Sequence, residues 1–446
     1  MDIAEIIERG LRKAEALGAS EAEIFIAREV STSITGTVKG LENIESGESI
    51  ATSLRIAIGK KISIQTCILS RAEDIDKVVE DAVKITRVAP EDRDWVSLPR
   101  SLGKTPLYYI VDDRIKKHNL DMFIDFVKRG LEKSREIDGR AYTSEAKVQL
   151  SYIVKAIGNS SYSPVESEKT VFSYIVEVKA VENDEESGYY NYYAAPTLNE
   201  FNLDKVVEDA VKIAVKSLRA KPVETGNYQV LFTPRVFASI LSALIVPAVR
   251  ADMVIKNRSP LKNKLYSEVL SEKLTIIDDG AAPNMLNSSE FDDEGIATMR
   301  KTVFDRGTLV TYLYDTYTAN IDGKSSTGNA RRTSSLVYPD ATNIIVLPGT
   351  ESVDSIERDV KKGIVIYNTI GEWLSNPVNG YLNATITNGI YIENGEEKQA
   401  VKGIVISGNI YEILGRNLAT ISKEYEHIGS MLAPSILVEK ISVAGK

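Results

Sequence analysis

DKVVEDAVKI occurs twice in this chain, at residues 76–85 and again at residues 204–213. Ten identical residues in a row do not arise from two unrelated segments, so the repeat indicates two copies of one unit. Arg9-Gly10-Leu11 recurs as Arg129-Gly130-Leu131, and Ser20-Glu21-Ala22 recurs as Ser144-Glu145-Ala146. The spacing between partners grows along the chain from 120 to 124 to 128 residues. We interpret this as a duplication with small insertions in the second copy.

Each copy is expected to fold as a helix, several strands and a second helix. Apolar residues recur at helical spacing from Ile3 to Ala14 and from Leu120 to Leu131, and the repeated segment closes each copy. Short turns such as Gly59-Lys60 predict antiparallel strands, so the fold class is α+β. The strands are expected at residues 23–27, 52–58, 61–67, 147–156 and 170–181, with a polar loop at 182–188.

Four tyrosines follow that loop: Tyr189, Tyr190, Tyr192 and Tyr193. A recognition surface accounts for them, because tyrosine brings rigid area with a polar tip. Packing on both faces of a strand accounts for them as well, and the sequence leaves both interpretations open.

The second half is expected to be rich in β-structure. Residues 221–226 read as a linker, a strand follows at 228–232, and an apolar helix begins at Pro234 and runs to about Val246. Further strands are predicted at 274–277, 308–314, 343–347, 364–367, 381–393, 401–406 and 435–441, with Asn394-Gly395 as a turn. We therefore predict an N-terminal α+β domain at residues 1–220 and a C-terminal β-rich domain at 227–446.

Composition excludes several classes of function. The net charge of −9 leaves no broad excess of Lys and Arg for a nucleic-acid surface. The most apolar stretch, residues 236–249, is too short to span a bilayer. Cys67 is the single cysteine, and the acidic N-terminus does not resemble a signal peptide. The sequence thus predicts a cytoplasmic protein with no nucleic-acid partner and no membrane partner.

Seven short strings, taken in order, resemble the TldD/PmbA family, once called modulators of DNA gyrase. The resemblance implies an N-terminal α+β domain, a C-terminal domain with twisted, barrel-like sheets, and assembly into dimers. The strings are FDDEG at 291–295, DRGTL at 305–309, YTA at 317–319, STGNARR at 326–332, ENG at 393–395, ISGN at 406–409 and ISVAG at 441–445.

The family contains two kinds of subunit, and this chain resembles the PmbA/TldE-like kind. TldD-like subunits carry HExxxH on the helix that opens the second domain, together with a cysteine near the C-terminus, and bind zinc. The matching helix here, residues 237–249, has neither His nor Glu. One register places Leu244 and Val249 near the two histidine positions, and the cysteine position falls near Ile428. The resemblance therefore implies no zinc, no other cofactor and no catalytic residue.

Other candidate residues receive structural interpretations. His427, beside the lost cysteine position, and His118 each lack a second ligand or catalytic partner nearby in the sequence. The acids Asp292, Asp293 and Glu294 suit a hard cation such as calcium, but without further ligand spacing a solvated loop is favoured. The same two interpretations apply to Asp278-Asp279.

Two further segments carry residue types that occur in binding sites. Arg331-Arg332 fits a peptide carboxylate, but a solvated loop is favoured. Residues 325–328 lack the glycines and the lysine of a phosphate-binding loop.

Three functions follow as hypotheses. The favoured one is a non-catalytic subunit that forms a heterodimer with a zinc-bearing TldD-like protease acting on unfolded peptides. The alternatives are a peptidase with an unrecognised site and a homodimeric peptide-binding module.

Overall fold

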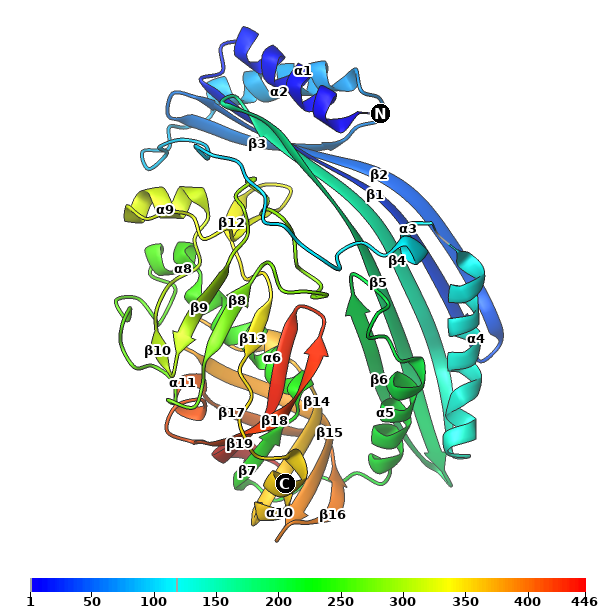
Figure 1. Ribbon diagram of the computed structural model, residues 1–446. Helices are drawn as coiled ribbons and strands as arrows, with labels where there is room; N and C mark the ends of the chain where they lie inside the picture. Colours follow the sequence, from blue (N-terminus) through cyan, green and yellow to red (C-terminus); the bar gives the residue numbers. More distant parts are fainter. Residues whose placement is uncertain (1, 118) are drawn as a thin grey trace.

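A computed structural model describes residues 2–117 and 119–446, so the expectation for His118 lies outside the described residues. The described chain forms a 6-stranded sheet, an 11-stranded sheet and a 2-stranded sheet. The 6-stranded sheet is long and curved, and the second half of the chain lies on its hollow side (Figure 1). Among the residues that the structure describes, no helix has the length and apolar character needed to cross a membrane.

The first half shows the duplicated topology. Its strand order is β3-β2-β1-β4-β5-β6, with every neighbouring pair antiparallel and the two copies joined through β1 and β4. The α+β class predicted from the sequence is confirmed. The elements are α1 (Ile3–Ala16), β1 (Glu21–Thr37), β2 (Gly40–Ile58), β3 (Lys61–Ile68), α2 (Asp74–Val88), α3 (Asp113–Lys116), α4 (Leu120–Ile137), β4 (Ala141–Asn159), β5 (Tyr162–Glu182), β6 (Glu185–Ala195) and α5 (Leu203–Lys216).

The repeated segment occupies equivalent places in the two copies. In α2 it packs against α1 and β3, and in α5 it packs against α4 and β6. Val79, Ala82 and Val83 are buried in the first copy, and their counterparts are buried in the second. Figure 1 shows α1 and α2 at one end of the long sheet and α4 and α5 toward the other. This arrangement supports the duplication.

The loop predicted at residues 182–188 is wrong. Glu182 pairs with Glu185 across a two-residue hairpin turn, in which Asn183 has a positive φ of 55°. The acidic residues misled the prediction because this end of the hairpin lies beyond the apolar core, where a strand needs no apolar side chains. The turn predicted at Gly59-Lys60 is present between Ile58 and Lys61.

The second half is built around a closed barrel. Strands β7, β14, β15, β17 and β19 follow one another, and β19 also pairs with β7 and closes the ring. The main elements are β7 (Gly226–Phe232), α6 (Pro234–Ile240), the π-helical turn η1 (Leu241–Ile245), α7 (Val246–Val249), α8 (Ala251–Ile255), β8 (Ile276–Asp279), β9 (Arg300–Asp305), β10 (Thr308–Leu309), α9 (Thr316–Asp322), β11 (Ala330–Arg332), β12 (Val337–Pro339), β13 (Ile344–Val346), α10 (Val353–Asp359), β14 (Lys362–Ile370), η2 (Glu372–Leu374), β15 (Tyr381–Glu393), β16 (Glu396–Val401), β17 (Ile404–Asn409), α11 (Ile410–Ile413), β18 (Leu418–Ile428) and β19 (Met431–Ala444).

Two predicted strands of this half need correction. The strand expected at 308–314 is two residues long as β10, because the chain then leaves the sheet toward α9. The run expected at 401–406 is divided between β16 and β17, with Gly403 at a positive φ of 70° between them. The turn expected at Asn394-Gly395 joins β15 to β16, and Asn394 has a φ of 52°.

The apolar helix predicted from Pro234 continues past Val246 to Val249. Its middle turn, η1, is π-helical and ends at Ile245, two residues before Pro247. Proline has no N–H to give to the carbonyl four residues earlier, and its ring collides with that carbonyl in a regular helix. A wider turn at this point removes the conflict and changes which helical residues share a face.

Candidate functional site

A cavity of about 470 Å³ opens beside the apolar helix. Helix α6 and η1 form one wall, and the end of β14, η2 and the turn between β18 and β19 form others. The structure thereby brings together the two segments to which the resemblance assigns the metal-binding motif and the cysteine. The lining residues are Tyr190, Tyr192, Arg235, Val236, Ala238, Ser239, Ser242, Ala243, Asn368, Thr369, Glu372, Trp373, Ile428, Ser430 and Met431.

The two residues that one register places near the HExxxH histidines do not line the cavity. Leu244 and Val249 are 0% and 1% exposed and belong to the main core cluster, away from the cavity lining. The two histidines of HExxxH lie five residues apart, and Ala238 and Ala243 are the pair of lining helix residues with that spacing. The π-helical turn makes this possible, since it brings residues five apart onto one face.

The lining does not fit a zinc ion. Ala238 and Ala243 carry no donor atom, and the residue after Ala238 is Ser239 rather than a glutamate. Ile428 stands at the cysteine position, and Glu372 is the one carboxylate of the lining. Catalytic zinc needs about three nitrogen, sulfur or carboxylate ligands. Across the described residues, no group of three or more His, Cys, Asp and Glu is placed to hold a metal ion.

His427 lies next to Ile428 but does not line the cavity. Its Nε2 atom lies 2.7 Å from the Gly429 carbonyl oxygen, and its ring meets the Tyr193 ring edge to face with centroids 6.0 Å apart. Burial lowers the pKa of His427, because desolvation penalises the imidazolium. The interpretation as a packed histidine agrees with these contacts.

Arg235 is the main cation of the cavity, and the sequence reasoning missed it. Its guanidinium lies 4.0 Å from the ring centroid of Tyr190 and 4.7 Å from that of Tyr192. Its Nη1 atom donates to the Tyr190 carbonyl at 2.9 Å, while its Nη2 atom is buried without a hydrogen-bond partner. A buried guanidinium with a free N–H edge is suited to binding a carboxylate or a carbonyl group.

Both interpretations of the tyrosine cluster hold, for different residues. Tyr189 and Tyr193 are buried at 7% and 9% exposure and pack in the core of the second copy. Tyr190 and Tyr192 point the other way on β6 and line the cavity. Alternation along one strand therefore divides the four rings between core and surface.

Glu372 and Trp373 complete the cavity, and neither carried a sequence signal. Glu372 is 5% exposed and accepts a hydrogen bond from the Thr369 hydroxyl. Trp373 stands at the rim with 70% of its surface exposed. The cavity thus combines a cation, an anion, hydroxyls and aromatic rings, a mixture suited to the backbone and varied side chains of a peptide.

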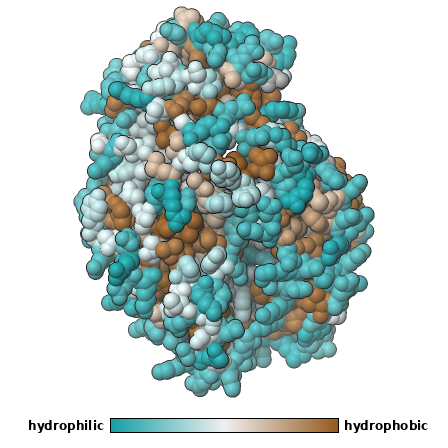
Figure 2. All heavy atoms as spheres, in the orientation of Figure 1, coloured by the Kyte–Doolittle hydropathy of each residue, from teal (hydrophilic) through white to brown (hydrophobic). Residues whose placement is uncertain are grey.

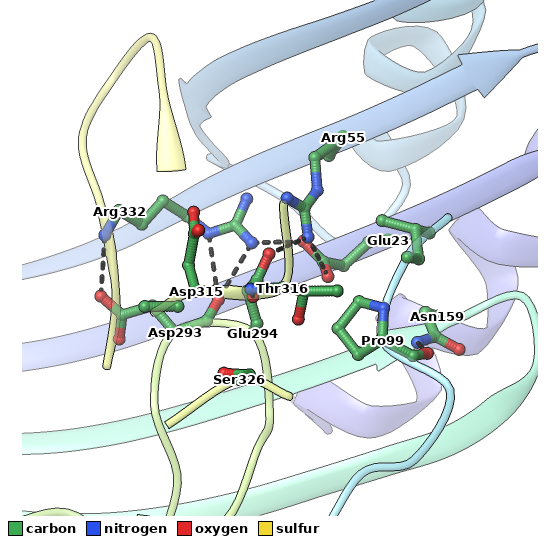
Figure 3. Close-up of polar contacts among 12 residues, drawn as sticks. Glu23, Arg55, Pro99, Asn159, Asp293, Glu294, Asp315, Thr316, Ser326 and Arg332 are labelled. Carbon is green, nitrogen blue, oxygen red and sulfur yellow. Dashed lines mark hydrogen bonds and ion pairs between the residues drawn. The ribbon is translucent and has the colours of Figure 1, made fainter. Parts of the chain in front are cut away.

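A second cluster of charges is buried where the two halves meet. Glu23 of β1 and Arg55 of β2 are 0% and 4% exposed, and Figure 3 shows them reaching toward Glu294 and Arg332. The Nη2 atom of Arg55 lies 2.8 Å from the Oε2 atom of Glu23 and 2.7 Å from the Oε1 atom of Glu294. Arg332 also pairs with Glu23. The sequence suggested a solvated loop for Arg332, which is wrong because its counterion comes from a distant strand.

The expectation of a solvated loop for Asp292, Asp293 and Glu294 is also wrong. The Asp292 carboxylate accepts backbone N–H groups from Glu294, Ile296 and Ala330 at 2.9–3.0 Å. Asp293 accepts the backbone N–H of Arg332 at 3.0 Å. These acids hold neighbouring loops in place.

Asp278 and Asp279 are likewise buried, at 0% and 5% exposure. Asp278 accepts from Lys301 and Asn329 at 2.7 Å, and Asp279 pairs with Arg300. In the segment 325–328, the Ser326 hydroxyl donates to the Tyr314 carbonyl at 3.3 Å, so this loop is bonded within the protein.

The comparisons with known proteins agree with this architecture. Residues 225–445 match the family model described as PmbA/TldA metallopeptidase C-terminal domain. An uncharacterized protein of Methanocaldococcus jannaschii is 28% identical over 98% of each chain. Metalloprotease PmbA of Escherichia coli O157:H7 is 23% identical over 99% of this chain and 97% of its own. The crystal structure of TldE from Thermococcus kodakarensis superposes with a TM-score of 0.90 and 24% identity, covering 99% of this chain and 100% of that one.

Proposed function

We propose that this chain, which belongs to the TldD/PmbA family, is the non-catalytic subunit of a two-subunit metalloprotease that acts on unfolded peptides. A TldD-like partner subunit supplies the zinc, and this chain supplies part of the peptide-binding surface. One observation carries the proposal: the helix that resembles the motif helix lines a cavity with polar side chains, yet this helix contains neither His nor Glu.

The lining supports peptide binding. An extended peptide presents carbonyl and N–H groups at regular spacing, and its two ends carry opposite charges. Arg235 offers a free buried N–H edge, Glu372 offers a carboxylate, and Trp373 offers an exposed apolar ring. Such a surface is expected to hold a peptide without cleaving it, because it lacks the ligands for a zinc ion that would activate water.

An exposed apolar segment at the rim supports subunit pairing. Trp373 and Leu374 are 70% and 72% exposed, and Ile370, Val378 and Tyr381 add further exposed apolar area in the same segment. Monomeric proteins rarely expose apolar residues clustered in this way, and such patches mark interfaces. We assign residues 370–381 to the contact with the zinc-bearing subunit, within an interface on the order of 1,200 Å² or more. A cytoplasmic location belongs to the same proposal.

Mixing experiments test the pairing directly. Alone, the purified chain is expected to hydrolyse no unstructured peptide. At micromolar concentration it is expected to co-elute with a TldD-like subunit encoded in the same genome and to raise peptide hydrolysis by that subunit. Size-exclusion chromatography with light scattering and a peptide-cleavage assay measure the two effects.

Matched variants locate the interface. Trp373→Asp is expected to abolish co-elution, because it places a charge in the centre of the apolar segment. Tyr266→Asp is the control, since Tyr266 is 78% exposed and lies outside that segment. Failure of the unaltered chain to co-elute would favour the homodimeric peptide-binding module, and zinc-independent cleavage by the chain alone would favour an unrecognised peptidase site.

A further inference from the structure

A second, more enclosed cavity of about 160 Å³ lies between the two halves of the chain. Strands β1, β4 and β5 of the first half form one side, and the segment 287–293 together with β11 forms the other. The volume accommodates several water molecules or one small polyatomic ion, since a water occupies about 30 Å³. The lining residues are Phe25, Ala27, Ile110, Ile153, Lys155, Ser167, Glu168, Lys169, Asn287, Ser289, Asp293 and Arg331.

Three cationic side chains line this small space. The Lys155 Nζ atom donates to the Phe291 carbonyl at 2.8 Å and lies 3.5 Å from an Asp293 oxygen. The Lys169 Nζ atom lies 3.4 Å from the Leu286 carbonyl. Arg331 forms no hydrogen bond or salt bridge through its guanidinium with any described residue, and Lys169 forms no salt bridge within the same part of the chain.

The carboxylates nearest this cavity make their contacts mainly with other groups. Asp293 is shared with the backbone N–H of Arg332 as well as with Lys155. Glu168 is engaged by Lys116 and by the Tyr152 hydroxyl, and Glu29 accepts from the Ser151 hydroxyl. Lys169 and Arg331 therefore lack a carboxylate partner in a partly buried space, where an added anion would be favourable.

The pKa of Lys169 reflects its burial and the cations around it. Burial, and then the charges of Lys155 and Arg331, lower the pKa of Lys169 to about 8. At neutral pH the Lys169 ammonium is nevertheless the major form. Burial also lowers the pKa of Lys155, against the opposing charges of Asp293 and Asp292. Ser167 adds a hydroxyl that has no hydrogen-bond partner among the described residues.

We propose that this cavity binds a small oxyanion, with Lys155, Lys169 and Arg331 as its charged ligands and the Ser167 hydroxyl as a neutral donor. Phosphate, sulfate and small carboxylates share this chemistry. The two lysines belong to β4 and β5 of the first half, whereas Arg331 belongs to β11 of the second. A bound oxyanion therefore links the halves at their junction. This inference is independent of the proposed function.

Isothermal titration calorimetry with inorganic phosphate tests the site. The experiment uses the full chain at pH 7, with ionic strength held constant by potassium chloride. Saturable 1:1 binding is expected for the unaltered chain. Lys169→Met should weaken it about tenfold or more, because a charged hydrogen bond is lost. Lys179→Met is the matched control, since Lys179 lies on the same strand and pairs with Glu186 at the surface.

Two further variants and a second anion complete the binding experiment. Lys169→Arg keeps the charge and should retain most of the binding, and Arg331→Met should lose it even if Lys169→Met proves unstable. Acetate in place of phosphate distinguishes a carboxylate site from a tetrahedral oxyanion site. Absence of saturable binding with both anions, or equal binding by Lys169→Met and Lys179→Met, would overturn the proposal.

Discussion

The first copy of the duplicated unit, residues 3–88, and the second, residues 120–216, share their order of helices and strands but differ in their cores. Ile, Leu, Val and Ala dominate the buried cluster of the first copy. The second copy is packed around aromatic rings, among them Phe123, Phe172 and Tyr174. One pattern of apolar positions thus accepts two sets of side chains, because total volume and spacing matter more than the identity of each residue.

The two copies also contact the second half of the chain differently. The first uses the buried charges of Glu23 and Arg55. The second copy places Lys155 near Asp293 at 3.5 Å and also contributes neutral bonds. Among these, the Asn388 amide donates to the Gly188 carbonyl at 3.0 Å and to the Ser217 hydroxyl at 2.9 Å. The face of the molecule in Figure 2 is largely hydrophilic, with hydrophobic residues in separate patches. The comparison teaches that duplication conserved the sheet, while each junction with the second half acquired its own chemistry.

The largest expected effect is a loss of stability on removing the Arg55 charge, compared with the loss on removing the Asn388 amide. Arg55→Met should lower the free energy of unfolding by about 3–5 kcal/mol, because it leaves the buried Glu23 and Glu294 without their shared cation. Asn388→Ala should cost about 1–2 kcal/mol, since it removes only neutral hydrogen bonds. Chemical denaturation measures both. Equal losses in the free energy of unfolding would show that the Arg55 ion pairs contribute no more to stability than the Asn388 hydrogen bonds.

Equivalent glycines sharpen the comparison of the cores. A Cβ atom at Gly130 would lie 1.9 Å from the Tyr174 hydroxyl oxygen, whereas one at Gly10 would lie 2.5 Å from a terminal methyl of Ile24. Gly130→Ala should therefore cost about 2–3 kcal/mol and Gly10→Ala about 1 kcal/mol, because an isoleucine methyl can rotate away more easily than a packed ring.

A double variant controls for this interpretation. Gly130→Ala combined with Tyr174→Phe removes the clashing oxygen, which has no hydrogen-bond partner of its own. Most of the lost stability should return. A double variant no more stable than Gly130→Ala would mean that the close approach of the Tyr174 oxygen is not the cause.

Asp315, which lies close to Glu294 and Arg55, predicts a pH dependence that the Asn388 hydrogen bonds lack. Burial, and then the charge of Glu294, raise the pKa of Asp315 from 3.8 to about 7. The folded state binds this proton more tightly than the unfolded state, so the stabilisation is complete below pH 4 and is lost as the pH rises through 7. Asp315→Asn keeps the helix cap on Thr318 and should remove most of this fall in stability, which amounts to at most about 4 kcal/mol.

Denaturation at a series of pH values measures this effect, with Asn388→Ala as the control whose profile should match that of the unaltered chain. If Asp315→Asn leaves the slope between pH 4 and 7 unchanged, the titrating group is a different one.

The smallest expected effect concerns the repeated helices themselves. The Asn202 side chain accepts the backbone N–H of Lys205 and caps α5, whereas Glu73 at the start of α2 makes no capping bond. Asn202→Ala should cost about 1 kcal/mol, and Glu73→Ala should change stability little. Thermal unfolding of both variants tests whether the helices that contain the two identical segments depend to different degrees on their N-cap residues.

Local patterns predicted most of the helices and strands, but they did not predict an irregular turn inside the apolar helix. The sequence predicted the apolar helix from Pro234, but it did not predict which helical residues face the cavity. The π-helical turn before Pro247 rotates Leu244 into the core and Ala238 and Ala243 to the cavity. Regular helical periodicity does not include that extra residue per turn.

The sequence by itself determined the duplication, the α+β class and the family, because these depend on repeats, on periodicity and on strings of residues in a set order. It also determined that the motif helix lacks His and Glu. Only the tertiary structure decided which charges are buried. Glu23 and Arg332 are 309 positions apart in the chain, yet they pair at the junction of the two halves. A charged residue is tolerated in the interior when a partner from another element meets it there. The identity of that partner depends on how the halves pack, and neither residue's sequence neighbours contain it.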